Sequence, residues 1–158
     1  MISDKESSIV VESLSSGMKV YENPFEVIYV ENVEDAPKEN EASSPVGRHL
    51  DGCRIGFDAG GSDRKVSAVV NGETVYSEEV VWFPKTNSDY HYHYDGIMAA
   101  MKTAASKMPR VDAIGVSSAG VYIDNKIMVA SLFLKVSDED FEKHVKNMYI
   151  NVAKEILS

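Results

Sequence analysis

The sequence predicts a mixed α/β domain whose elements follow the order strand, strand, strand, helix, strand, helix. Three short apolar runs between residues 53 and 82 are separated by glycine-containing turns, which predicts consecutive antiparallel strands. A helical apolar period follows over 95–108, and the lone apolar run VDAIGVSS precedes a second helical period that continues to the C-terminus. Because a helix connects them, the lone strand should lie parallel to the first strand and beside it.

The composition limits the classes of protein to consider. A chain of 158 residues with 44% hydrophobic residues can bury one core, and a formal net charge of -9 argues against binding to a nucleic-acid backbone. No apolar run reaches the length of a membrane span, and the first residues lack the pattern of a secretory signal. The single cysteine, Cys53, lies in an apolar run, so we expect an inert core thiol and a cytoplasmic protein.

The chain divides near residue 51. Residues 31–51 are rich in Glu, Asp, Asn, Pro and Ser, a composition typical of a linker, so we expect an extension over 1–51 and a domain over 52–158. Ahead of this linker, GMKVYENPFEVIYVENV contains two β-type runs broken at Asn23 and Pro24. This pattern predicts a short β-hairpin, which gives the extension a β-type character.

The strands of the domain are predicted at 53–58, 64–70 and 73–82. Asn71 and Gly72 favour the positive φ angles of a two-residue turn between the second and third strands. In RIGFDAGGSDRKVSAVV, Gly60 and Gly61 are expected to supply backbone angles that a Cβ disfavours. The resulting hairpin either merely turns the chain or holds a phosphate.

The two helices follow from their apolar spacing. The first shows one apolar face and has Pro109 just beyond its end; that face consists of Ile97, Met101, Ala105 and Met108. Ser137 begins SDED, which resembles a capping box and predicts a helix from there to the C-terminus. Between third strand and first helix, DYHYHYD is interpreted as a solvated aromatic loop, since His91 and His93 have no third metal ligand at suitable spacing.

Two segments resemble known proteins. The predicted domain has the element order βββαβα. Within it, IGFDAGGSDRKVSAVVNGETV resembles the first phosphate motif of the superfamily of actin, heat-shock ATPases and sugar kinases. VDAIGVSSAGVYIDNKIMVASLFLKV is similar to the ROK family of bacterial sugar kinases and regulators. The resemblance implies a ribonuclease-H-like mixed sheet, forming an incomplete N-terminal lobe of an actin-like ATPase fold that stops before a fifth strand.

The first motif implies a nucleotide site for ATP and Mg²⁺. Backbone N–H groups of the hairpin would contact phosphate oxygens, and Asp58 would orient Mg²⁺ through water. Lys65 follows Asp58 at a spacing that resembles actin and the acyl-CoA dehydratase activators, whereas ROK kinases do not require this lysine. The implied phosphate and nucleotide residues are Asp58, Gly60, Gly61, Ser62, Asp63 and Lys65.

The second motif implies a sugar site bordered by Ser118, Gly120 and Ser131. ROK kinases commonly have Pro before the glycine and Asn before the later leucine, where this chain has Ala119 and Ser131. The resemblance therefore does not identify the sugar. The general-base aspartate of such kinases is expected beyond Ser158, so the resemblance implies no catalytic residue in this chain.

Three functions remain open from the sequence. The leading one is the phosphate- and sugar-binding lobe of an ATP-dependent ROK sugar kinase, inactive by itself, with a sugar and a nucleotide as partners. The second is a non-catalytic ligand-sensing lobe of a ROK regulator, although residues 1–50 lack the basic helix-turn-helix of such regulators. The third is an ATPase lobe of the dehydratase-activator or acetate-kinase type, which Lys65 favours and the absence of a cysteine cluster disfavours.

The fold implied by the resemblance also predicts self-association. In that fold, later sequence would cover the strand at 111–118 and the last helix, so we expect exposed apolar side chains over 113–116 and an unpaired strand edge. The run FEVIYV is a candidate to cover such a surface. We therefore expect a homo-oligomer, most simply a two-fold dimer.

Overall fold

The computed structural model describes residues 19–24, 29–38 and 49–158, and the chain divides into two units, Met1–Arg48 and His49–Ser158. In the first unit, residues 19–21 are helical and Val33–Asp35 forms a short 3₁₀ helix. The predicted β-hairpin is therefore wrong in its first run, where a helical turn can satisfy backbone groups locally without a partner strand. Residues 25–28, most of FEVIYV, lie outside the described residues.

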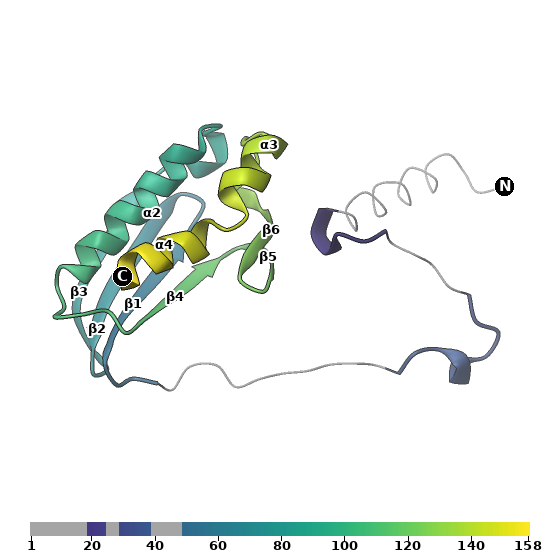
Figure 1. Ribbon diagram of the computed structural model, residues 1–158, viewed down its shortest axis with the longest axis horizontal. Helices are drawn as coiled ribbons and strands as arrows, with labels where there is room; N and C mark the ends of the chain where they lie inside the picture. The colour runs from purple at the N-terminus through teal and green to yellow at the C-terminus, as the bar shows by residue number, and fades with distance from the viewer. Residues whose placement is uncertain (1–18, 25–28, 39–48) are drawn as a thin grey trace. The chain divides into compact units, whose positions relative to one another are not determined.

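The second unit, here called the sheet domain (His49–Ser158), contains a four-stranded mixed sheet in the order β3-β2-β1-β4 (Figure 1). Its strands are β1 (Cys53–Ala59), β2 (Asp63–Val70), β3 (Glu73–Val81) and β4 (Ala113–Ser118). The first three pair antiparallel, and β4 pairs parallel with β1. This topology confirms the strand order and directions predicted from the turns and the intervening helix.

The turn between β2 and β3 also confirms its prediction. Asn71 has φ 50° and Gly72 has φ 87°, the left-handed angles that a two-residue hairpin turn requires. Asn71 also accepts a hydrogen bond at its Oδ1 from the backbone N–H of Gly52, at 2.9 Å. This turn therefore ties the end of β2 to the chain entering β1.

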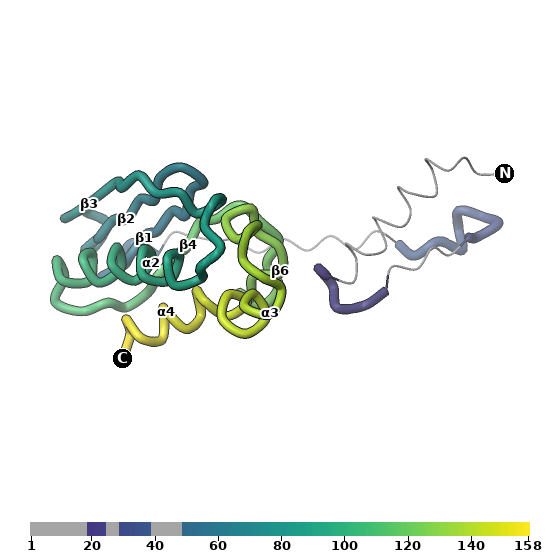
Figure 2. The backbone as a smooth tube through the Cα atoms, turned by 90° about the horizontal axis from the view of Figure 1, so that it is seen from above, coloured from purple at the N-terminus to yellow at the C-terminus, as the bar shows by residue number. Residues whose placement is uncertain are grey.

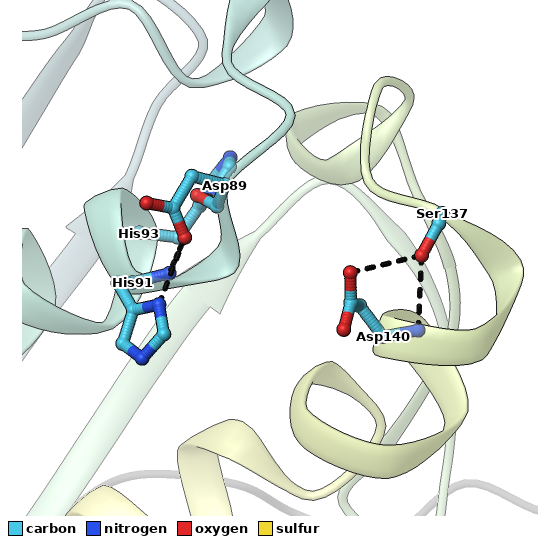
Figure 3. A network of polar contacts seen from close by, with 5 residues as sticks. All are labelled: Asp89, His91, His93, Ser137 and Asp140. Carbon is cyan, nitrogen blue, oxygen red and sulfur yellow. Dashed lines mark hydrogen bonds and ion pairs between the residues drawn. The ribbon is translucent and has the colours of Figure 1, made fainter.

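Helix α2 (Tyr90–Ala105) begins earlier than the predicted 95–108 and ends earlier as well. Asp89 caps it by accepting a hydrogen bond from the N–H of His91, as Figure 3 shows. His93 is 0% exposed, with Nε2 at 3.0 Å from the carbonyl oxygens of both Pro84 and Leu132. The predicted solvated loop is thus wrong, because His93 and Ile97 lie one helical turn apart on the buried face.

The chain after β4 forms a separate two-stranded sheet of β5 (Gly120–Ile123) and β6 (Lys126–Ala130). Its turn places Asp124 and Asn125 at φ 51° and 63°. A 3₁₀ helix, Ser131–Phe133, then leads toward the C-terminal helices. The chain between β4 and the C-terminal helices is therefore a short antiparallel hairpin followed by one helical turn.

The C-terminal segment is helical but not one continuous helix. It consists of α3 (Asp138–Asp140), a π-helical turn (Phe141–Val145) and α4 (Met148–Leu157). Ser137 caps the start, since its Oγ accepts a hydrogen bond from the N–H of Asp140 (Figure 3), which confirms the predicted helix start. The predicted continuity is wrong, because the chain bends at Asn147 and the carbonyl of Lys146 accepts a hydrogen bond from Ile127 of β6.

The core lies between the sheet and two helices that cover the same face, α2 and α4 (Figures 1 and 2). In β1 the buried residues alternate, and Cys53, Ile55, Phe57 and Ala59 all face these helices. Cys53 is 2% exposed, as expected for a core thiol. Within the sheet domain, no described helix covers the opposite face, called here the open face. None of the described helices has the length and apolar content to cross a membrane.

Candidate functional site

The loop between β1 and β2 is fixed to the domain through its carbonyl groups. Trp82, which follows β3 and is 1% exposed, donates from its indole Nε1 to the carbonyl oxygen of Gly60 at 2.8 Å. The backbone N–H of Trp82 donates to the carbonyl oxygen of Ser62 at 3.1 Å. Among the described residues, no hydrogen bond engages the backbone N–H of Gly61 or Ser62. The loop therefore presents amide donors from a fixed position.

The two glycines of this loop serve a purpose other than the predicted one. Neither has a positive φ angle, so the expectation of unusual backbone angles at Gly60 and Gly61 is wrong. A Cβ at Gly60 would lie 2.5 Å from the carbonyl oxygen of Asp63, and a Cβ at Gly61 would lie 2.6 Å from Nζ of Lys85. Glycine is therefore needed at Gly60, where a side chain would meet backbone, whereas at Gly61 only the flexible end of the Lys85 side chain occupies the space.

Lys85 is the site residue that the sequence did not reveal. It lies in the 3₁₀ helix Pro84–Thr86, its side chain is exposed, and its ammonium group rests against Gly61. In the described part of the chain it forms no ion pair or hydrogen bond. The only available signal was topological, since antiparallel pairing returns the end of β3 to the start of β2, beside the loop.

Lys65 lies near the loop but is already paired. Its Nζ is 2.8 Å from Oδ1 of Asp63 and 3.8 Å from Oε1 of Glu79, and its side chain is 47% exposed. The hydrogen bond to Asp63 raises the pKa of Lys65 above its ordinary value. The structure thus brings Lys65 close to the predicted phosphate residues, but its ammonium group forms ion pairs with two carboxylates.

Asp58 lies on the open face between two neighbouring strands. Its partners in register are Lys65 on β2 and Ser117 on β4. These three residues border a shallow cavity of about 620 Å³. Within the described residues, no group of three or more His, Cys, Asp or Glu side chains could hold a metal ion. A single carboxylate fits only a Mg²⁺ ion that keeps most of its own water or phosphate ligands.

The three residues implied for the sugar site do not line one cavity. Ser118 borders a cavity of about 580 Å³ between β4, α4 and the β5–β6 hairpin, whereas Gly120 and Ser131 do not. A Cβ at Gly120 would collide with the carbonyl oxygen of Val129, so this glycine permits close pairing of β5 and β6. Ser131 begins a 3₁₀ helix. The sequence motif therefore combines one cavity residue with two residues that shape the hairpin.

Two tyrosines that the sequence analysis missed lie beside Ser118. The hydroxyl groups of Ser118, Tyr122 and Tyr149 are buried, and among the described residues none has a hydrogen-bond partner of good geometry. Burial raises the pKa of Tyr149 far above its ordinary value, and the hydroxyl groups of Ser118 and Tyr122 lie near enough to affect that pKa as well. These groups are therefore neutral at physiological pH and can both donate and accept hydrogen bonds.

The sequence matches no known protein family, and none of the curated proteins matches it.

Proposed function

We propose that the sheet domain is a phosphate-binding lobe of the ROK type, within the superfamily of actin, heat-shock ATPases and sugar kinases. The observation that carries the proposal is the loop 60–63, where the amide groups of Gly61 and Ser62 have no hydrogen-bond partner among the described residues and the unpaired ammonium group of Lys85 lies beside Gly61. A concave run of backbone N–H groups next to a cation is a favourable environment for phosphate oxygens.

The topology supports the same assignment. The loop follows β1, and β1 and β4 are parallel neighbours, so Asp58 and Ser117 meet at the carboxyl ends of both strands. Ligands of α/β proteins bind preferentially beyond the carboxyl ends of parallel strands. The cavity of about 620 Å³ beside Asp58 offers room for the rest of a nucleotide.

The charges around the loop favour a phosphate that arrives with Mg²⁺. Asp58, Asp63 and Glu79 surround Lys65 on β2, and these three carboxylates would repel an uncompensated polyphosphate. A bound Mg²⁺ would neutralise phosphate charge, with Asp58 holding it through water. Lys85 and the loop amides would then bind the phosphate oxygens directly.

The nature of the substrate is the less supported part of the proposal. Ser118 alone among the three implied sugar residues borders a cavity, where Tyr122 and Tyr149 add hydroxyl groups suited to a sugar. The alternative of a dehydratase-activator-like ATPase rested on Lys65, whose ion pairs with Asp63 and Glu79 weaken it. A ROK-type sugar kinase lobe therefore remains the preferred assignment.

Intrinsic fluorescence provides the test, because Trp82 is the single tryptophan of the chain and its indole holds the loop. Titration with MgATP and with magnesium pyrophosphate should change the emission with saturation. Lys85→Gln should raise the dissociation constant about tenfold, since one charge-assisted contact to phosphate is lost.

Lys107→Gln is the matched control, because Lys107 follows the far end of α2, where its Nζ lies over the ring of Tyr76. This variant should bind as the unmodified chain does. Equal affinity of the Lys85→Gln variant, or an unchanged emission with both ligands, would contradict the proposal.

A further inference from the structure

β4 presents a bare edge on the side away from β1. In the described part of the chain, β4 pairs with no strand other than β1, and this pairing runs without any shift in register. Its six residues, Ala113–Ser118, include no charged residue and no proline. Natural sheets usually protect an exposed edge with charge, proline or a bulge, so this edge lacks the common safeguards against pairing.

The opposite edge of the same sheet is protected. β3 carries Glu73, Glu78 and Glu79, and its pairing with β2 contains a bulge between Ala68 and Val69. Two copies of β3 would bring carboxylates together. The contrast between the two edges indicates that β4, and not β3, is the edge that accepts another strand.

The outward backbone groups of β4 can be assigned from its pairing. The N–H of Asp112 donates to the carbonyl oxygen of Cys53 at 2.8 Å, and in a parallel ladder alternate residues face the neighbouring strand. The N–H of Cys53 also donates to the side chain of Asp112, so Cys53, Ile55 and Phe57 of β1 direct their backbone groups toward β4. In a parallel pair such residues bond to the residues that flank their register partners, which are Ile114 for Ile55 and Val116 for Phe57, so Ala113, Gly115 and Ser117 bond toward β1. Ile114 and Val116 direct their N–H and C=O groups away from the sheet, so these two residues can pair with a new strand.

The space beside this edge is shaped for side chains of an added strand. The cavity of about 580 Å³ is walled by Ile114 and Val116 of β4, and by Ile150, Ala153 and Leu157 of α4. Val116 is 38% exposed and Leu157 is 47% exposed, although both are apolar. A strand next to β4 would place every second side chain against these residues and remove them from water.

We propose that the occupant of this edge is a second copy of the chain, with β4 pairing antiparallel to its own copy across a two-fold axis at Gly115. Each chain carries a net charge of -9, and the uncharged β4 allows two such chains to approach without like charges in the strand pair. The two sheets become one continuous sheet of eight strands, twice the four of one chain. Identical edges can satisfy each other in this way, as an isologous interface requires.

In this dimer the helices add an apolar contact to the strand pair. α4 lies on the same face of the sheet in both copies, so the two-fold axis brings the exposed Leu157 and Val116 side chains of the copies together. The inference concerns the β4 edge and requires no nucleotide. Its failure would leave the phosphate proposal untouched, and the reverse also holds.

Substitutions at Gly115 and Val116 test the dimer at its axis. A Cβ at Gly115 meets no atom within 4 Å, so side chains fit there in the single chain. Val116→Pro removes an outward N–H while the bonds of Gly115 and Ser117 to β1 remain. Gly115→Lys keeps that N–H but sets two ammonium groups opposite each other at the axis. Gly115→Ala is the matched control, since it adds only a methyl group.

Sedimentation equilibrium of the whole chain should give twice the 17.4 kDa mass of one copy. The Gly115→Ala variant should remain dimeric. The proline and lysine variants should raise the dissociation constant of the dimer about a hundredfold, because the two-fold axis places each substitution in the interface twice. Circular dichroism and thermal unfolding establish whether each variant is folded. If the proline variant does not fold, the lysine variant alone tests the dimer.

A monomeric chain at high concentration would overturn the proposal. Dimers that persist in both folded variants would do so as well, since another surface would then hold the copies together. A monomer that instead binds an added extended peptide at β4 would assign the edge to a foreign strand and refute self-pairing.

Discussion

His93 is the buried residue that joins three separate segments of the sheet domain. Its ring faces the carbonyl oxygens of Pro84, Asp89 and Leu132, at 3.0 to 3.1 Å. It also contacts the ring of Phe133 at a centroid distance of 4.8 Å. His93 is thus a packing residue that closes the chain after β3 onto the chain after β6.

Replacing His93 should be costly. His93→Ala removes a fully buried ring and its hydrogen bonds, so we expect the free energy of unfolding to fall by about 2–4 kcal/mol in urea denaturation. His91→Ala is the control, because the side chain of His91 is 61% exposed. Similar small losses for both variants would show that His93 does not join these segments.

Asp112 makes the stability of the domain depend on pH. Its carboxylate accepts hydrogen bonds from Nε of Arg110 at 2.7 Å and from the backbone N–H of Cys53 at 2.8 Å. Both bonds lower the pKa of Asp112 from 3.8, its ordinary value. A lowered pKa means that the folded state favours the charged form, so this stabilisation is present above pH 3.8 and disappears as the pH falls through the lower folded-state pKa.

The Asp112→Asn variant should therefore unfold at a lower temperature than the unmodified chain at pH 7. The difference should shrink as the pH falls below about 4, where the carboxylate of the unmodified chain becomes protonated in the folded state too. Thermal unfolding followed by circular dichroism measures this. Asp95→Asn, at an exposed position of α2, should show no such trend; a difference that stayed constant from pH 7 to pH 2 would exclude the charge of Asp112 as the cause.

At the scale of elements, local sequence predicted the sheet well. The apolar run of β1 and the Asn71-Gly72 turn act over a few residues, and the strand and the turn were both found as expected. The start of α2 was missed because tyrosines and histidines are weak helix formers, and burial of His93 against distant carbonyl groups adds to the cap of Asp89 in stabilising that turn. The bend near Asn147 was missed for a related reason, since it depends on a hydrogen bond from β6 to Lys146.

The candidate site shows the same division between local and distant determinants. The sequence located the loop from its glycines, but only the structure shows that the backbone of Asp63 lies against Gly60 and the side chain of Lys85 against Gly61. Lys85 itself could not be recognised, because its position depends on the pairing of β2 with β3 and on the path after Trp82. A local sequence motif cannot identify residues that only tertiary contacts bring together.

At the scale of the molecule, the sheet domain has three distinct surfaces. One face of the sheet is covered by α2 and α4, the open face carries the row of Asp58 and Lys65, and β4 forms a bare edge (Figure 1). The proposed phosphate loop lies at the carboxyl ends of β1 and β4, away from the middle of the β4 edge. Nucleotide binding and dimer formation can therefore be measured separately.

The most direct test of phosphate binding observes the loop amides themselves. In ¹⁵N–¹H correlation spectra, titration with magnesium pyrophosphate should shift the amide signals of Gly61 and Ser62, because these N–H groups would donate to phosphate oxygens. Gly72, in the turn at the opposite end of β2, should keep its signal unchanged. Saturable shifts at Gly61 and Ser62, with a dissociation constant about tenfold higher in the Lys85→Gln variant, are the predicted result. Unchanged signals for both loop amides at millimolar ligand would contradict a phosphate site in this loop.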